Sequence, residues 1–402
     1  MDRLANTVRP YAWGSTTAIP ALLGTPATGE PQAELWLGAH PGDSSRVDRG
    51  DGPVELAAVI AADPVGELGE AAVAHFGPTL PFLLKVLAAE LPLSLQVHPT
   101  REQAQQGFAA EEAAGIPVEA GHRNYKDANH KPELICALED FDGLCGFREP
   151  LGTAALMEEL AVPGLAPLID LLRTKPAEQA LRETLVTVLA ADPLVVEATV
   201  AELAQALADK LAAEPESPNA PAWAGYAHCA RHFPGDPGVL AALLFNFVRL
   251  RAGEALYLGA GVPHAYLNGT GVEIMANSDN VLRCGLTPKH VDVPELLKVV
   301  RFEAGEAEVL RPVAGADGEE LFPVPIDEFR LSRFELTADA PQRRVDGRTA
   351  QILLCTEGTV LLTDAAGEKL ELAKGQSAFL PATGSGTELS GEGVLFRATV
   401  TL

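Results

Sequence analysis

The segment from Leu93 to His98 alternates between apolar and polar residues. Successive side chains of a strand point to opposite faces. A strand here would set Leu93, Leu95 and Val97 on one face and Ser94, Gln96 and His98 on the other. The polar row has no lysine or glutamate, which are usual on solvated strands, and its Ser, Gln and His side chains suit a polar pocket. The alternative is an exposed strand face, which this segment alone does not exclude.

A carboxylate opens the next candidate strand, in the stretch Asn129–Cys136. Pro132 has a fixed φ and no N–H to donate, so it suits the start of a strand. Lys131 and Glu133 then share a face, and an apolar run from Leu134 to Leu138 follows. Glu133 is therefore a candidate metal ligand or proton-transfer group. The alternative is a surface ion pair at the end of a strand.

His264 lies in a glycine-rich stretch. From Gly253 the chain runs five residues to Gly259, one to Gly261, two to His264 and three to Asn268. This spacing resembles the second motif of the cupin superfamily, with Gly259 where proline is usual. Two short strands joined by a tight glycine turn would aim the histidine into a barrel, whereas the alternative is a lone core histidine.

Nitrogen and oxygen donors of these types suit zinc, and no thiolate is needed. We therefore expect one Zn²⁺ per chain, in a site open to substrate. A single carboxylate among the donors leaves that site cationic, which suits a developing oxyanion. The expected ligands are Gln96, His98, Glu133 and His264.

The elements that must position these residues are strands interrupted by one helical block. Residues 1–148 are expected to form strands and loops, including a buried strand from Phe82 to Ala88. In residues 149–250 apolar residues recur at helical spacing, as at Leu203, Leu207 and Leu211. Prolines divide this block into several helices, and a returning helix is expected from Val239 to Leu250.

From Gly253 the β pattern resumes and continues to the end of the chain. Gly375, five residues and Pro381 echo the opening of the histidine motif without its histidine. We expect a mainly β fold with an all-α insert, made of two cupin-type jelly rolls and a helical domain. Residues 1–148 and 251–300 would form the zinc-binding jelly roll, 149–250 the helical insert, and 301–402 a second, metal-free jelly roll.

Composition excludes several classes of protein. With 30 Lys and Arg against 55 Asp and Glu, the formal charge is −25, which opposes nucleic-acid binding. No apolar run approaches the roughly 18 residues of a membrane helix, and no signal peptide is evident. Five cysteines without a CxxC motif indicate free thiols in a reducing cytoplasm. Because no long exposed apolar stripe stands out, we expect a monomer.

Several motifs resemble those of the type I mannose-6-phosphate isomerases, over most of the chain. They are Tyr11–Ser15, Glu34–Pro41, Leu93–Pro99, Asn124–Asp127, His130–Glu133 and the long block Gly271–His290. The departures at Leu37 and Ala39 are small, whereas the helical block and the C-terminal quarter match only in type. The resemblance implies a zinc enzyme that interconverts mannose 6-phosphate and fructose 6-phosphate. It also implies that the four residues above bind zinc and that Arg283 is an active-site arginine.

Such an isomerase moves a proton between C1 and C2 through an enediol, so it needs a base and a grip on the phosphate. The base candidates are Lys131, Glu273, His130 and Asp279. A lysine beside a dication is pushed towards its neutral form, so Lys131 could be the base or a plain hydrogen-bond donor. Glu273 could be the base or could orient Lys131.

The planar fork of Arg283 suits either the enediolate or the phosphate. The substrate-binding candidates are Ser94, Lys289 and Tyr266. The partner expected is a small phosphosugar, with no nucleic acid and no membrane.

Two other functions compete with the isomerase. An iron-dependent cupin oxygenase would use two histidines and one carboxylate, and a fourth ligand at Gln96 argues against it. A non-catalytic sugar-binding cupin would tolerate changes at Lys131 and Arg283.

Overall fold

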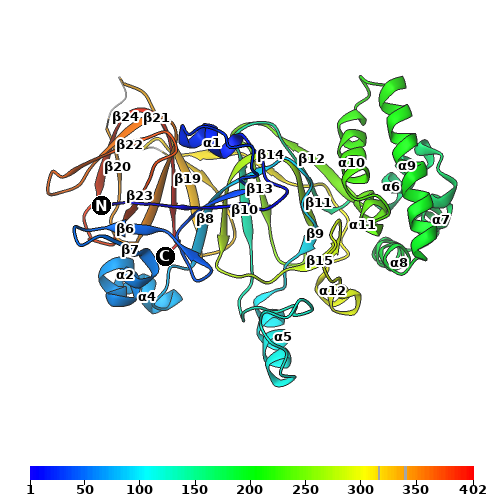
Figure 1. The fold of residues 1–402 in the computed structure, drawn as a ribbon, viewed down its shortest axis with the longest axis horizontal. Helices are drawn as coiled ribbons and strands as arrows, with labels where there is room; N and C mark the ends of the chain where they lie inside the picture. Colours follow the sequence, from blue (N-terminus) through cyan, green and yellow to red (C-terminus); the bar gives the residue numbers. More distant parts are fainter. Residues whose placement is uncertain (316, 339–341) are drawn as a thin grey trace.

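The computed structural model describes residues 1–315, 317–338 and 342–402, and most of its strands belong to two large antiparallel sheets. Figure 1 shows the two sheets side by side, with a block of helices beyond the first sheet. Eleven strands form the first sheet: β2 (Thr7–Arg9), β3 (Glu34–Leu37), β8 (Phe82–Ala89), β9 (Leu95–Val97), β10 (Glu133–Ala137), β11 (Phe141–Phe147), β12 (Phe245–Leu250), β13 (Ala255–Leu258), β14 (His264–Ala276), β15 (Leu282–Gly285) and β16 (Val309–Leu310).

The second sheet has nine strands, and it is built mainly from the C-terminal quarter of the chain. Its strands are β1 (Asp2–Arg3), β17 (Val313–Ala314), β18 (Glu319–Phe322), β19 (Arg330–Leu336), β20 (Arg343–Val345), β21 (Gln351–Thr363), β22 (Lys369–Ala373), β23 (Ser377–Leu380) and β24 (Thr387–Thr399). Two small hairpins complete the β structure: β4 (Ala39–His40) with β5 (Asp43–Ser44), and β6 (Arg46–Asp48) with β7 (Pro53–Glu55).

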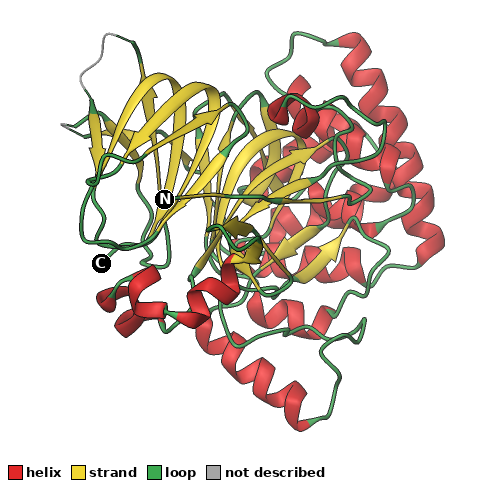
Figure 2. Cartoon of the chain, turned by 60° about the vertical axis from the view of Figure 1, so that its left-hand side comes forward, coloured by secondary structure: helices red, strands yellow, loops and turns green. Residues whose placement is uncertain are grey.

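Among the described residues, helices occur in three parts of the chain, and Figure 2 shows them around the sheets. The N-terminal third contains α1 (Ala18–Leu23), α2 (Leu56–Ala62), α3 (Pro64–Leu68), α4 (Glu70–Phe76) and α5 (Arg101–Ala113). The central block contains α6 (Pro150–Leu160), the 3₁₀ helix η1 (Pro163–Leu165), α7 (Ala166–Thr174), α8 (Ala177–Leu189), α9 (Pro193–Ala213), α10 (Ala220–His232) and α11 (Pro237–Ala242). One more helix, α12 (Val293–Val299), follows β15.

The two large sheets pack face to face. Their shared core takes alternate residues of β8, β10 and β14 from one side and of β19, β21 and β24 from the other. Fully buried examples are Val86 and Ile274 in the first sheet and Leu331 and Ile352 in the second. Each such side chain contributes about 1.5–3 kcal/mol relative to exposure. The opposite faces of β8 and β14 are therefore free to line a separate interior.

Strand β14 passes from one part of the first sheet to another and bends at Gly269. Before the bend it pairs with β9 and β11, and after it with β8 and β10. Gly269 has a φ of +120°, and a Cβ there would lie 2.8 Å from the carbonyl oxygen of Asp140. Only glycine fits this corner without strain. The bend folds the sheet over an apolar cluster that includes Ile135, Phe141 and Tyr266.

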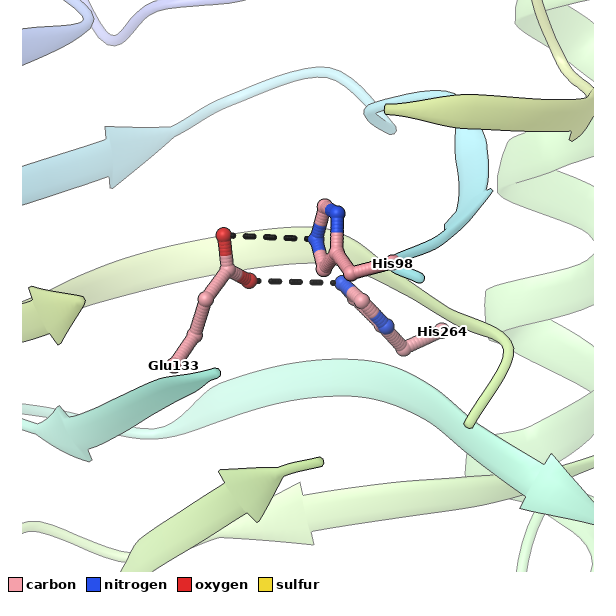
Figure 3. A group of neighbouring side chains, drawn as sticks. All are labelled: His98, Glu133 and His264. Carbon is pink, nitrogen blue, oxygen red and sulfur yellow. Dashed lines mark ion pairs between the residues drawn. The ribbon is translucent and has the colours of Figure 1, made fainter. Parts of the chain in front are cut away.

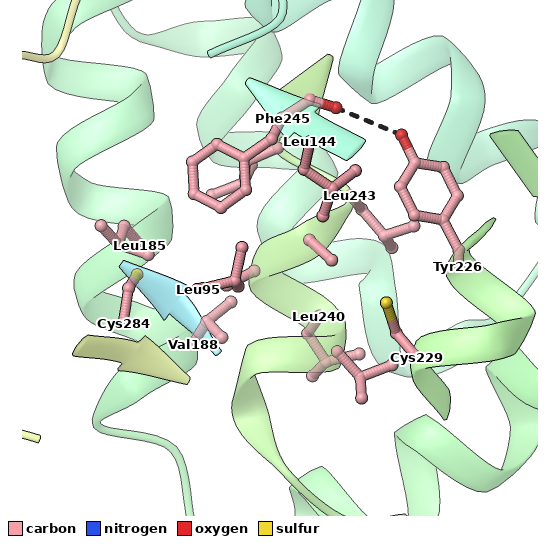
Figure 4. Close-up of a cluster of buried hydrophobic side chains, with 14 of the residues drawn as sticks. Leu95, Leu144, Leu185, Val188, Tyr226, Cys229, Leu240, Leu243, Phe245 and Cys284 are labelled. Carbon is pink, nitrogen blue, oxygen red and sulfur yellow. Dashed lines mark hydrogen bonds between the residues drawn. The ribbon is translucent and has the colours of Figure 1, made fainter. Parts of the chain in front are cut away.

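The helical block packs on the outer face of β9, β11 and β15 (Figure 4). Leu95 and Val97 are fully buried in this contact, beside helix residues such as Leu185 and Leu240. The Tyr226 hydroxyl donates a hydrogen bond of 3.2 Å to the carbonyl oxygen of Phe245, so a buried polar group is paired. The predicted apolar row is thus confirmed for Leu95 and Val97, which face helices rather than a core between strands. Leu93 precedes β9 and packs instead against the cluster that includes Phe141.

The secondary structure confirms some predictions and corrects others. Strand β8, the strand at Ala255–Leu258 and the helices of the central block occur as expected, and Pro193 and Pro237 each begin a helix. The helix predicted from Val239 to Leu250 is wrong: α11 ends at Ala242, and Phe245–Leu250 is a strand paired with β11. Hydrogen bonding to β11 stabilises a strand there, although the local spacing of apolar residues suggested a helix.

Residues 1–148 also contain more helix than the sequence analysis predicted. Helices α2 to α4 and the longer α5 lie in the stretch expected to hold only strands and loops. A capping box at Thr100 and Gln103 starts α5 and is a signal that the sequence pattern contained. The sheets also exchange edge strands, because β1 pairs with β23 and β16 pairs with β13.

No single helix of the described residues is both long and apolar enough to span a membrane. The pair α8 and α9 reaches the required length and composition only together, and these two helices meet at 107°.

Candidate metal centre and active site

Three buried side chains converge where strands of the first sheet begin or end (Figure 3). His98 follows β9, Glu133 opens β10 and His264 opens β14. The Nε2 atom of His98 lies 3.4 Å from Oε1 of Glu133, and Nε2 of His264 lies 3.4 Å from Oε2. None of the three residues is more than 2% exposed. The surface ion pair and the isolated core histidine are therefore both excluded.

Backbone carbonyls decide which ring nitrogen of each histidine carries its proton. Nδ1 of His98 lies 2.7 Å from the carbonyl oxygen of Asn280, and Nδ1 of His264 lies 3.0 Å from that of Val262. A carbonyl only accepts, so each Nδ1–H donates and each Nε2 keeps its lone pair towards Glu133. Burial lowers the pKa of His98 to about 4, which keeps its ring neutral.

The converging atoms are acceptors without a donor. Within the described part of the chain, neither Nε2 atom nor Oε2 of Glu133 has a hydrogen-bond partner. Lone pairs facing one another in a buried site are costly unless a cation lies between them. The donor atoms lie within 4.8 Å of one another, and two imidazoles with a carboxylate form a set that zinc uses with a further position open. The geometry fits a catalytic zinc ion.

Lys131 stabilises the ionised ligand. Its Nζ lies 3.1 Å from Oε1 of Glu133, and both side chains are largely buried. Burial alone would raise the pKa of Glu133, but the charge of Lys131 holds it well below its usual value. Glu133 is thus an anion ready to bind a metal.

Gln96, the fourth expected ligand, lies opposite His264 and Arg283 in the β ladder. Residues directly opposite one another in a ladder project to the same face. Gln96 is therefore on the face that carries the metal candidates, while its neighbours Leu95 and Val97 face the helices. Ser94 lies one residue before β9 begins and is half-buried.

A buried charge network lies on the interior face of β3, β8 and β14. Lys85 Nζ is 3.1 Å from Oε2 of Glu273 and 3.5 Å from Oε1 of Glu34. Tyr266 donates a 2.9 Å hydrogen bond to the other oxygen of Glu273, and the Trp36 indole donates to Glu34 at 2.7 Å. The network places two carboxylates and one ammonium beside the metal candidates.

Burial in this network changes the acidity of its members. Burial raises the pKa of Glu273, and the neighbouring Glu133 and Glu34 act in the same direction although Lys85 opposes them. Burial and the charge of Glu273 raise the pKa of Tyr266 well above its usual value. A raised pKa makes this carboxyl group easier to protonate, and a carboxyl group beside a metal site can serve as a general acid or base.

Lys85 and Glu34 were not among the site residues predicted from the sequence. Both stand in strands whose other residues are apolar, and a lone charge in a buried strand is the signal that could have identified them. The strands that hold their partners are far apart in the chain. In the sheet, Lys85 lies directly opposite Trp36 of β3 on one side and Glu273 of β14 on the other.

Two of the four base candidates lie elsewhere. His130 directs Nε2 to Glu328 at 2.7 Å. Asp279 has a side chain 59% exposed, with Oδ1 3.7 Å from Nε2 of the buried His40. Lys131 and Glu273 are thus the candidates that face the buried centre.

Arg283 and Lys289 form a cationic pair near Gln96. Burial lowers the pKa of both, and the charge of Arg283 lowers that of Lys289 further, because like charges oppose one another. Neither side chain makes an ion pair with any residue that the structure describes. In a chain of net charge −25, two adjacent cations without acidic partners suit an anionic ligand.

Asn280 is a further residue that the sequence analysis did not single out. Its fully buried amide accepts from the backbone N–H groups of Lys126 and Asp127 and donates to the carbonyl oxygens of Asp127 and Asn129. Its own carbonyl oxygen accepts from His98. Asn280 therefore connects the loop before Lys131 to a metal ligand.

Comparisons with known proteins agree with this site. Residues 1–150 match a family model described as phosphomannose isomerase type I, catalytic domain, and residues 319–400 match one described as mannose-6-phosphate isomerase, cupin domain. The chain is similar to mannose-6-phosphate isomerase of Escherichia coli (strain K12), with 42% identity over 99% of each chain. It is also similar to that of Homo sapiens, with 32% identity over 95% of this chain and 93% of the human protein.

Solved structures show the same similarity. A crystal structure of mannose 6-phosphate isomerase from Salmonella typhimurium, bound to substrate and a zinc atom, superposes with a TM-score of 0.91 at 40% identity, covering 100% of both chains.

Proposed function

The chain belongs to the type I mannose-6-phosphate isomerases, and on this premise we propose that it interconverts mannose 6-phosphate and fructose 6-phosphate with zinc as its cofactor. The main support for the proposal is that acceptor atoms of His98, Glu133 and His264 face one another in a buried site with no donor between them. Around it lie groups able to move a proton and a pair of cations suited to a phosphate. The reaction is an aldose–ketose isomerisation through an enediol.

The zinc ligands are His98, Glu133 and His264, with Gln96 as the fourth. The bound metal supplies Lewis acidity to the sugar oxygens. The chain's own part is to keep both histidines in the Nδ1–H tautomer and Glu133 ionised, as the bonds to Asn280, Val262 and Lys131 require.

Glu273 is the group that moves the proton between C1 and C2. Its raised pKa allows it to take a proton from one carbon and return it to the other. Tyr266 and Lys85 each bond one of its oxygens and hold the carboxyl in place. Lys131, bonded to Glu133, is a hydrogen-bond donor to the sugar. His130 and Asp279 take no part in the proton transfer, because Nε2 of His130 faces Glu328 and Asp279 is exposed beside His40.

Arg283 and Lys289 bind the phosphate and stabilise negative charge that develops on the enediolate. Two side-chain cations are required because the chain has no glycine-rich phosphate loop. Ser94, on the polar row with Gln96, adds a hydroxyl donor for the same group.

The proposed domains are those predicted from the sequence, with one changed boundary. Residues 1–148 with 245–300 form the zinc-binding jelly roll, residues 149–244 a helical insert and residues 301–402 a metal-free jelly roll. The pairing of β11 with β12 moves the end of the insert to about residue 244, because β12 belongs to the first sheet. We place the enzyme in the cytoplasm as a monomer, in keeping with five free, buried cysteines.

A coupled assay tests the function. Purified protein is incubated with mannose 6-phosphate, and fructose 6-phosphate is measured before chelation, after chelation and after zinc is restored. We expect turnover that the chelator abolishes and zinc recovers. Turnover that is absent with zinc, or that survives removal of the metal, would overturn the proposal. Stoichiometric iron with oxygen uptake would instead indicate the oxygenase.

A further inference from the structure

The second sheet contributes one carboxylate to the loop that leads into the metal site. Glu328 lies between β18 and β19, and its side chain is 10% exposed. The next residue, Phe329, is fully buried in the core between the two sheets. The backbone N–H of Thr401 donates to the carbonyl of Asp327 on the other side. Glu328 is therefore held firmly by its own sheet.

The partner of Glu328 is His130, directly before Lys131. Nε2 of His130 lies 2.7 Å from Oε1 of Glu328, and the same oxygen accepts a hydrogen bond from Nη2 of Arg101 on α5. Nη2 of Arg101 also lies 2.9 Å from Nε2 of His130, but the carboxylate of Glu328 has no proton to offer, so the shorter contact decides the tautomer. A carboxylate accepts from both groups at once only if Nε2 carries the proton of His130. Burial alone would raise the pKa of Glu328, yet the hydrogen bond from His130, with further hydrogen bonding and the nearby charges, lowers it to about 2.

The same loop is held from the opposite side. Asn280, next to the first-sheet strand β15, bonds the backbone of Lys126, Asp127 and Asn129. The loop from Lys126 to His130 is thus bonded on one side to Asn280 of the first sheet and on the other to Glu328 of the second. The contact of Glu328 with His130 is called the clamp below. Lys131 follows without an intervening residue, and its Nζ bonds Glu133.

We infer that Glu328 is a positioning residue for the isomerisation, which holds His130 in the Nε2–H tautomer and thereby places Lys131 at the metal site. The inference rests on the proposed function. It assigns a role in catalysis to the sheet that has no metal candidates among its described residues. It also explains why the carboxylate of Glu328, remote in sequence and largely buried, meets an imidazole and a guanidinium that each lie three residues from a candidate metal ligand.

Kinetics of matched variants test the role. Glu328→Ala removes the clamp, Glu328→Gln keeps an acceptor oxygen, and Glu320→Ala is the control, because Glu320 forms a similar ion pair with Arg333 on the second sheet. We expect Glu328→Ala to lower kcat by about 10- to 100-fold, since small misplacement near a reacting centre has effects of this size. KM and zinc content should change little. Glu328→Gln should retain most of the turnover, and Glu320→Ala nearly all of it.

A double variant separates positioning from general stability. Once His130→Ala has removed the imidazole, adding Glu328→Ala should lower kcat by less than about twofold, because coupled residues are not additive. Equal and independent losses in the two variants would overturn the inference, as would a kcat for Glu328→Ala within twofold of the Glu320→Ala control.

Nitrogen-15 NMR of the histidine rings in the unmodified, zinc-loaded protein gives a readout that needs neither variants nor turnover. We expect His130 to carry its proton on Nε2. The opposite tautomer would overturn the inference even if Glu328→Ala failed to fold. A protein with no mannose 6-phosphate turnover but with this tautomer would refute the proposed function and leave the clamp intact.

Discussion

Replacing Lys85 with methionine removes the ammonium that lies between two buried carboxylates. In the native chain Lys85 Nζ is 3.1 Å from Glu273 and 3.5 Å from Glu34, and none of these side chains is more than a tenth exposed. Methionine keeps much of the volume and none of the charge. The two carboxylates would then face each other without neutralisation, and breaking a buried pair in this way costs about 3–5 kcal/mol.

Protonation limits that cost and makes it depend on pH. At pH 7 a carboxyl with an ordinary pKa near 4.3 can take up a proton for about 4 kcal/mol, and near pH 5 for about 1 kcal/mol. Glu273 already has a raised pKa in the folded state, and loss of Lys85 raises it further. A folded pKa above the unfolded value gives stability at low pH that is lost as the pH rises through the folded pKa. The deficit of Lys85→Met should therefore grow from about 1 kcal/mol near pH 5 to about 4 kcal/mol near pH 7.

Urea unfolding at several pH values measures this deficit. Trp36 lies over Lys85, with Nζ 5.5 Å from the ring centroid, so tryptophan fluorescence reports on the same region. A chelator in every sample keeps metal binding from contributing to the comparison. The matched control is the double variant Lys85→Met with Glu273→Gln, which removes the carboxyl that must be protonated.

The double variant should recover most of the stability at pH 7 and lose the pH dependence. If Lys85→Met unfolded within about 0.5 kcal/mol of the native chain at every pH, the buried network would not carry the charges assigned to it. A deficit that was constant with pH would equally refute the reasoning, because it would indicate lost packing rather than unpaired carboxylates.

Three further predictions concern the metal and the substrate. Arg283→Ala should lower turnover of mannose 6-phosphate by orders of magnitude with zinc content unchanged by metal analysis, and full turnover would remove Arg283 from the active site. Asn280→Ala should weaken zinc binding by about 10- to 100-fold in competition with a chelator, because Asn280 fixes the loop beside the ligand His98; unchanged affinity would refute this. With free zinc at a thousand times its Kd, the zinc-bound protein should be about 4 kcal/mol more stable to unfolding than the metal-free protein. Calorimetry that gave the same unfolding midpoint with and without metal would contradict the site.

Periodicity and turn residues predicted an element correctly where its own residues contain a clear pattern. The apolar run at β8, the proline starts of α9 and α11 and the glycine turn before His264 are all local features. Phe245–Leu250 was predicted wrongly because a short apolar segment suits either a helix or a strand, and pairing with β11 decides between them. Helices α2 to α4 escaped prediction because they are short and stabilised by tertiary packing rather than by their own sequence.

The sequence by itself determined the chemistry of the candidate metal site: which side chains carry nitrogen and oxygen donors, and that His98, Glu133 and His264 stand at strand ends. The tertiary structure alone decided how these donors meet. Backbone carbonyls of Asn280 and Val262 turn both Nε2 atoms towards Glu133, and the register of β3, β8 and β14 sets Lys85 beside two carboxylates. Glu328 reaches His130 from another sheet, 198 residues away along the chain. Such contacts depend on long-range strand pairing, which one-dimensional patterns do not encode.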